Sequence, residues 1–83
     1  MTLDYSRLRS LTAREIIGGL LRDGFSMHRQ TGSHRQYRHP DGRRVTVTFH
    51  HSSSTFPLPT LKAMIDEQAK WSEGDLLRLK LLR

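Results

Sequence analysis

The chain has no cysteine among its 83 residues, which excludes a disulfide framework and a thiolate metal cluster. This absence is typical of a protein that works in a reducing cytoplasm. No apolar run approaches the roughly 20 residues that span a bilayer, and residues 1–5 lack the charged start and apolar run of a signal peptide. We therefore expect a single cytoplasmic domain over residues 1–83, with a small core and no membrane segment.

Acidic residues are scarce in one part of the chain. Residues 28–44 contain five arginines and a single acid, Asp41, which gives a net charge of +4, whereas residues 1–27 and 45–83 each carry a net charge of +1. A local excess of positive charge favours a polyanionic partner, most often a nucleic acid. The alternative is a solvated, arginine-rich hairpin without a partner.

A first helix is predicted after Thr12. Thr12 and Glu15 match a capping box, apolar residues follow at helical spacing, and Gly24 is a typical helix stop. Gly18 and Gly19 weaken this helix by about 1 kcal/mol each relative to alanine. We interpret them as room for close packing of the helix on a sheet.

Two further helices are predicted near the C-terminus. Pro57 and Pro59 lead into a helix whose apolar stripe consists of Leu61, Met64, Ile65 and Ala69. Residues 72–75 resemble a second capping box, which opens a last helix over residues 76–82. Leucines nearly encircle that helix, so its surface either binds a partner or docks fully on the core, and the pattern leaves both open.

Three strands are predicted between these helices, over residues 25–30, 34–39 and 43–49. In the first strand, Phe25 and Met27 share one face. The element order predicts an α+β fold. It is α-β-β-β-α with a short extra C-terminal helix, and helices cover one face of a three-stranded antiparallel sheet.

The register of the second hairpin follows from its apolar residues. Val45, Val47 and Phe49 share one face of the third strand and should point to the core together with Tyr37. A three-residue loop over residues 40–42, with its glycine left-handed, pairs Tyr37 with Val45 and keeps the faces matched.

The same register places His34 on the outer face, opposite Thr48 and diagonal to His50. A histidine titrates near neutral pH and can accept or give a proton. Phosphodiester cleavage needs a base at the ribose 2′-hydroxyl, an acid at the leaving oxygen and positive charge on the phosphate. His34, His50 and Arg38 fit these roles. The alternative is a surface histidine that only bonds a neighbouring strand.

Other chemistry at this site is disfavoured. The five histidines of the chain invite a zinc site, but the pleat puts His39 and Arg35 on the face opposite His34, so we expect no metal and no cofactor. Ser33 precedes His34 directly, points to the other face, and is better placed to bond backbone or phosphate than to act as a nucleophile. Gly32 supplies a turn conformation or lets an RNA backbone come close.

Several motifs together resemble the HicA toxins, the mRNA interferases of HicA/HicB toxin–antitoxin pairs. They are REII at 14–17, LLRDGF at 20–25, GSHRQYRHPDGR at 32–43, and VTV at 45–47 followed by His50. The resemblance covers roughly residues 12–70. Its specificity lies in the combination of GSH, the aromatic residue three positions on, the PDG turn and the VTV strand.

The resemblance implies a fold similar to the double-stranded RNA-binding domain. It also implies a metal-independent endoribonuclease toxin that cleaves mRNA and inhibits translation, with His34 as the catalytic residue. It also implies a HicB-type antitoxin that covers the active face, within a toxin–antitoxin assembly of higher order. On this interpretation the RNA contacts are expected from Gly32, Ser33, Arg35, Arg38, Arg43, Arg44, His50 and Lys62. The alternative is a non-catalytic RNA-binding module of the same fold.

Two departures from the family pattern affect substrate contacts. Thr48 and Phe49 stand where the family usually has a proline and a basic residue, and the loop over 52–55 is rich in serine rather than lysine. Both changes remove phosphate contacts, so we expect them to alter substrate affinity more than fold.

Overall fold

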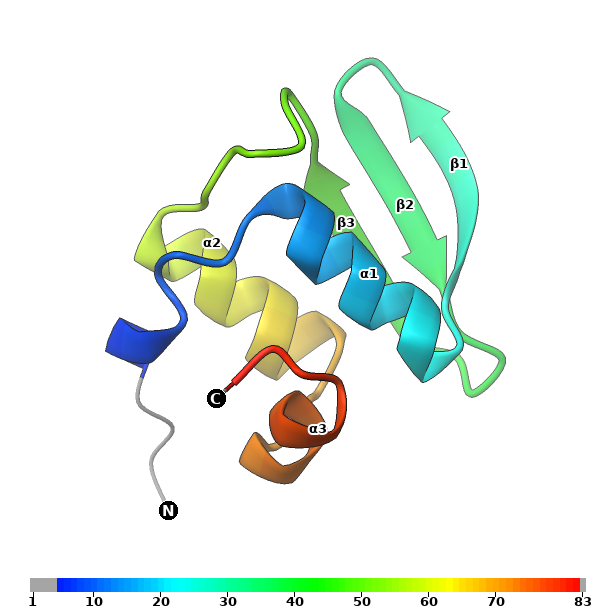
Figure 1. Cartoon of the computed structure of the whole chain (residues 1–83). Helices are drawn as coiled ribbons and strands as arrows, with labels where there is room; N and C mark the ends of the chain where they lie inside the picture. Colours follow the sequence, from blue (N-terminus) through cyan, green and yellow to red (C-terminus); the bar gives the residue numbers. More distant parts are fainter. Residues whose placement is uncertain (1–4, 83) are drawn as a thin grey trace.

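The computed structural model describes residues 5–82, in which helices cover one face of a three-stranded antiparallel sheet (Figure 1). The strands lie in the order β1 (Ser26–Thr31), β2 (His34–Arg38) and β3 (Arg44–Thr48). The helical elements are η1 (Tyr5–Arg7), α1 (Ala13–Asp23), α2 (Leu58–Lys62), η2 (Ala63–Gln68) and α3 (Glu73–Arg78). The predicted α-β-β-β-α order with a short extra helix is confirmed.

Helix α1 begins and ends as its sequence predicts. The Thr12 hydroxyl accepts a hydrogen bond from the Glu15 N–H at 3.2 Å, and the Glu15 carboxylate accepts one from the Thr12 N–H at 3.0 Å. Gly24 ends the helix with φ at 104°, a left-handed value that glycine adopts at little cost. The helix buries Ile16 and Leu20 against the sheet and the C-terminal helices.

The β2–β3 hairpin has the predicted register. Tyr37 lies opposite Val45 and His34 opposite Thr48, while Tyr37, Val45 and Val47 are buried in the core. Gly42 has φ at 99°, so the three-residue loop with a left-handed glycine is also confirmed. This register separates the apolar inner face of the sheet from a polar outer face.

Strand β1 departs from simple alternation at a bulge. Met27 pairs with Tyr37, but Arg29 pairs with Gln36, so His28 is an extra residue in the strand. Met27 is therefore on the inner face, yet it is 52% exposed because β1 is an edge strand. The bulge also turns Arg29 to the outer face, which strict alternation from Met27 would not do.

Helix α2 continues directly into a π-helical turn, η2, beside the edge of β3. The Ala69 N–H donates to the Met64 carbonyl, five residues back, at 2.8 Å. From this turn the Gln68 side-chain oxygen accepts a hydrogen bond from the Thr46 N–H at 2.9 Å. The side chain thus satisfies a backbone donor that the edge strand would otherwise leave free.

Helix α3 is shorter than predicted. It begins at the expected capping box of Ser72 and Asp75 but ends at Arg78 rather than continuing to residue 82. Lys80 is left-handed, with φ at 62°. The N–H groups of residues 80 and 81 donate to the carbonyls of residues 77 and 76. This is a Schellman motif, which stops a helix and reverses the chain.

The reversed chain docks on α1. A side chain at Gly19 would place its Cβ 2.7 Å from a methyl group of Leu81, so the close neighbour of Gly19 is this C-terminal segment and not the sheet. The leucines 76, 79, 81 and 82 are buried, while Leu77 is half exposed. The last helix therefore docks on the core through most of its apolar surface. No helix within residues 5–82 is long and apolar enough to cross a bilayer.

Candidate functional site

His34 is the first residue of β2 and lies exposed on the outer face of the sheet. A two-residue turn precedes it, in which Gly32 has φ at 58°, as the first position of a tight hairpin turn requires. The Ser33 carbonyl accepts a hydrogen bond from the Phe49 N–H at 2.6 Å. The backbone of His34 is thus fixed between Thr31 of β1 and Thr48 of β3.

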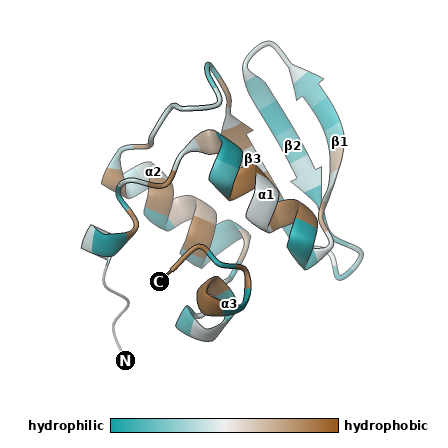
Figure 2. Ribbon diagram, in the orientation of Figure 1, coloured by the Kyte–Doolittle hydropathy of each residue, from teal (hydrophilic) through white to brown (hydrophobic). Residues whose placement is uncertain are grey.

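Strands β1 and β2 are largely hydrophilic (Figure 2), and none of the three strands contains a carboxylate. The register assigns to the outer face Ser26, Arg29, Thr31, His34, Gln36, Arg38, Arg44, Thr46 and Thr48. Arg38 lies directly opposite Arg44, an arrangement of like charges that costs stability without a counterion. The outer face therefore has the electrostatics of an anion-binding surface.

The spacing of these residues refines the sequence prediction. Arg38 is four residues from His34 along β2, or about 13 Å at the rise of a strand. This separation is larger than the predicted joint action of His34 and Arg38 on one phosphate requires. Arg29 lies diagonally across from His34, about 7–8 Å away between backbones, and is the arginine that sequence reasoning missed. The bulge at His28 brings it to this face.

Gly32 leaves space beside the histidine. A Cβ at Gly32 would meet no atom of the described chain within 4 Å, so the backbone there is open to close approach. The imidazole of His34 itself makes no hydrogen bond within residues 5–82. Both features describe an accessible surface at this end of the sheet.

His50 lies two residues beyond the end of β3, in the loop that leads to α2. The loop, and not the pleat, sets its position, so the predicted diagonal arrangement with His34 does not follow from the sheet. A cleft nevertheless brings His50 together with Thr48, the cross-strand neighbour of His34. Ser54, Thr55 and Thr60 add hydroxyl groups to this cleft. No group of three metal-ligating side chains occurs among the described residues.

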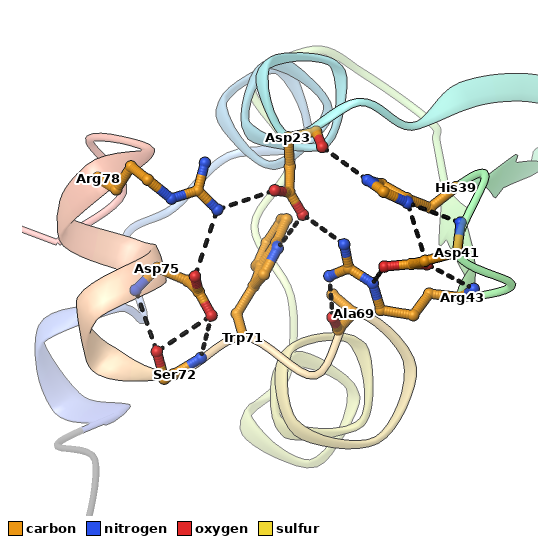
Figure 3. Close-up of polar contacts among 9 residues, drawn as sticks. All are labelled: Asp23, His39, Asp41, Arg43, Ala69, Trp71, Ser72, Asp75 and Arg78. Atoms are coloured by element: carbon orange, nitrogen blue, oxygen red, sulfur yellow. Dashed lines mark hydrogen bonds and ion pairs between the residues drawn. The ribbon is translucent and has the colours of Figure 1, made fainter.

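Arg43, a predicted RNA contact, is partly buried and bonded to the scaffold (Figure 3). Its guanidinium forms ion pairs with Asp23 at 3.1 Å and Asp41 at 2.7 Å and donates to the Ala69 carbonyl at 2.6 Å. It also lies over the ring of Phe25, 4.9 Å from the centroid. These contacts give Arg43 a role in the scaffold and leave it poorly placed for RNA.

Asp23 is the centre of this polar network (Figure 3). Its side chain is only 8% exposed and also accepts hydrogen bonds from Arg78 at 2.8 Å and from the Trp71 ring N–H at 2.9 Å. Burial by itself raises the pKa of Asp23, but the hydrogen bonds and charges of Arg78, Trp71 and Arg43 outweigh it and hold the pKa below its usual value. The carboxylate stays ionised and joins α1 to the β2–β3 turn and to α3.

His39 extends the network to the β2–β3 turn. Its Nδ1 accepts a hydrogen bond from the Asp41 N–H at 3.0 Å, so its Nε2 carries the proton that is donated to the Asp23 carbonyl at 2.8 Å. This histidine is therefore part of the scaffold, in contrast to His34.

The remaining predicted contacts fall in separate places. Arg44 belongs to the outer face, whereas Arg35 is on the inner face with its guanidinium 3.8 Å from the ring centre of Phe49. Lys62 lies on α2, with its ammonium 5.3 Å from the ring of Tyr5. The outer face therefore groups His34 with Arg29, Arg38 and Arg44.

The comparison with protein families gives one match, to the family described as the HicA toxin of bacterial toxin-antitoxin, over residues 13–71. The chain belongs to the HicA toxin family. The family assignment made from the GSH, PDG and VTV motifs is thus confirmed. A comparison with curated proteins gives no match.

The matched residues of this HicA toxin run from the start of α1 to Trp71. They include the whole sheet, the GSH turn and the cleft at His50, while α3 and the Schellman turn lie outside them. As a HicA toxin, the chain is a component of a toxin–antitoxin system.

Proposed function

We propose that this toxin is an endoribonuclease that cleaves mRNA in the cytoplasm, stops translation, and uses His34 as its catalytic residue. The observation that carries the proposal is the exposed His34 on an outer face with Arg29, Arg38 and Arg44 and no strand carboxylate. A histidine with access to solvent, held on a strand and surrounded by cations, suits proton transfer next to a bound phosphate.

The reaction needs no metal. A base removes the proton of the ribose 2′-hydroxyl, and the resulting oxygen attacks the adjacent phosphorus. The bond to the 5′-oxygen breaks, and an acid returns a proton to that leaving oxygen. His34 is the base or the acid in this scheme. His50, in the neighbouring cleft with Thr48, is the candidate for the second proton transfer.

The arginines of the outer face bind flanking phosphates. Each phosphate contact releases counterions, so the affinity for RNA falls as salt rises. The diagonal position of Arg29 relative to His34 suits it to the phosphate nearest the cleaved bond. Arg38 and Arg44, at the other end of the strands, bind the RNA about two nucleotides away from the cleaved bond.

The antitoxin of the pair is proposed to be a HicB-type protein that covers the outer face. A carboxylate-rich segment would neutralise the unpaired charges of Arg38 and Arg44 and exclude RNA from His34. This contact is expected to weaken with salt in the same manner as RNA binding.

The test compares the wild-type toxin with His34→Ala on an mRNA, each with and without EDTA. General acid–base catalysis contributes roughly 100- to 10,000-fold, so we expect cleavage by His34→Ala to fall at least 100-fold and EDTA to have no effect. His51→Ala, a change to another exposed histidine, is the matched control and should cleave as the wild type does.

Equal cleavage by the wild type and His34→Ala would contradict the catalytic role of His34. Loss of cleavage in EDTA would contradict a metal-independent reaction. If neither protein cleaves and both bind RNA with the same affinity, the chain is a non-catalytic RNA-binding module.

A further inference from the structure

A second set of cations lies at the same end of the sheet as His34, on the helix side. A groove there is lined by Arg14, Ile17, Arg35, Phe49 and Ser52. It runs between the first turn of α1 and the loop after β3, since the N–H groups of Ala13 and Arg14 donate to the carbonyls of Ser54 and Ser52. No carboxylate lines this groove.

Arg35 occupies this groove at an energetic cost. It faces inward opposite the core residue Val47, and its Nε is buried without a hydrogen-bond partner among the described residues. An unsatisfied buried donor is unfavourable. The stacking of its guanidinium on Phe49, at 3.8 Å, offsets part of this cost and fixes a flat cation beside an aromatic ring.

Arg14 adds a second positive charge under unfavourable conditions. It lies in the first turn of α1, where the helix dipole disfavours a cation. The adjacent Glu15 forms no ion pair with Arg14 in the described chain, and its carboxylate instead accepts hydrogen bonds from the N–H and hydroxyl of Thr12. The groove thus combines two cations, an aromatic ring and the aliphatic side chain of Ile17 in one place.

We propose that this groove is a nucleotide subsite, which holds the base of a nucleotide next to the cleaved bond. The base packs on the Arg35–Phe49 pair and Ile17, and Arg14 and Arg35 bind its phosphate. Arg guanidinium planes and aromatic rings are the surfaces on which unstacked RNA bases pack. This inference rests on the proposed ribonuclease function, since it assigns part of the same substrate.

The geometry connects the groove to His34. Phe49 is bonded through its N–H to the carbonyl of Ser33, the residue that precedes His34. The groove and the histidine therefore lie on the two faces of the sheet at one end. A single-stranded RNA that bends around the open Gly32–Ser33 turn reaches both the groove and His34. The ring of Phe49, with the Arg35 guanidinium over it, gives this subsite a surface suited to base packing.

The test measures binding of an uncleavable probe, a fully 2′-O-methylated RNA octamer, and of the same octamer with abasic nucleotides. The wild-type toxin should bind the base-bearing probe more tightly. Phe49→Leu keeps an apolar side chain but removes the ring. It should lower the affinity for the base-bearing probe by roughly ten-fold and leave the affinity for the abasic probe unchanged. Arg35→Lys keeps the charge but removes the planar surface and should act in the same direction.

Arg14→Gln should lower the affinity for both probes. It should also reduce the slope of log affinity against log salt by about the value of one phosphate contact. Arg9→Gln, an exposed arginine outside the groove, is the charge-matched control. The subsite proposal is overturned if Phe49→Leu and Arg35→Lys bind the base-bearing probe with the wild-type affinity. It is also overturned if these variants lose the same affinity for the base-bearing and the abasic probe. Since the probe cannot be cleaved, the failure of catalysis by His34 would leave this result unaffected.

Discussion

The two ends of the sheet carry the same kinds of side chain in opposite situations. At the turn over residues 39–43, which we call the closed end, His39 and Arg43 are bonded to Asp23 and Asp41. At the turn over residues 32–33, the open end, His34 and Arg35 have no carboxylate partner in the described chain. Both ends belong to the most basic segment of the sequence.

The difference comes in part from an acid that α1 delivers to the closed end, where Asp41 of the turn is the other carboxylate. Asp23 is the last residue of α1, so its carboxylate reaches the closed end and cannot reach the open end. The first turn of the same helix brings Arg14 to the open end. Helix α1 therefore adds a negative charge, Asp23, to the closed end and a positive charge, Arg14, to the open end. The charges that stabilise the fold are thus separated from the cations that have no carboxylate partner in the described chain.

The largest expected effect is on the closed end. Asp23→Asn removes the charge that pairs Arg43 and Arg78, and leaves the half-buried guanidinium of Arg43 without its inner partner. Breaking such a pair should lower the free energy of unfolding by about 3 kcal/mol. Urea unfolding measures it. The fraction that remains folded should cleave RNA at the wild-type rate, and a loss of stability below about 1 kcal/mol would contradict the role of Asp23.

A matched pair of adjacent arginines separates the two roles of charge. Arg43→Gln should destabilise the fold by about 2 kcal/mol, because it leaves Asp23 buried with less compensation. Arg44→Gln, on the outer face, should leave stability nearly unchanged and weaken RNA binding. Thermal unfolding and RNA titration of both variants test this. The interpretation would be wrong if the two variants behaved alike.

The sequence predicts some of this organisation well. Both capping boxes, at Thr12 and Ser72, and the hairpin register that puts Tyr37 opposite Val45 follow from local spacing and are present in the structure. These features depend on residues a few positions apart, or on the match of two apolar faces. The outward direction of His34 follows from the same register.

Other features depend on contacts that sequence spacing does not contain. Arg43 and Asp23 are 20 positions apart, and only the packed fold shows that they pair. The bulge at His28 carries no glycine or proline signal, so the side to which Arg29 points was not predictable. The end of α3 was missed because Lys80 adopts a left-handed conformation that is usual for glycine.

Acid should weaken the closed end. The pKa of Asp23 is lower in the folded protein than its usual value near 3.9, so the folded state binds fewer protons than the unfolded state in this range. Its contribution to stability is complete above about pH 5 and is lost as the pH falls through the folded pKa. Urea unfolding between pH 3 and 6 should show this slope, and Asp23→Asn should reduce it.

The smallest effect on stability is expected at the open end. Gly32→Ala places a Cβ on a residue with φ at 58°, which costs about 1 kcal/mol of conformational energy, although the space around it is open. If an RNA backbone approaches closely there, cleavage should fall much more than stability. If cleavage and stability fall by equal and modest amounts, the role of Gly32 is only to form the turn.

The bulge in β1 also affects whether two molecules can pair through the edges of their sheets. Of the two edges of the sheet, β3 has its Thr46 N–H taken by Gln68, and β1 is interrupted at His28. Neither edge offers an unbroken ladder of donors and acceptors on which a second sheet could grow. The irregularity that turns Arg29 to the outer face thereby also protects the free toxin against strand-to-strand aggregation.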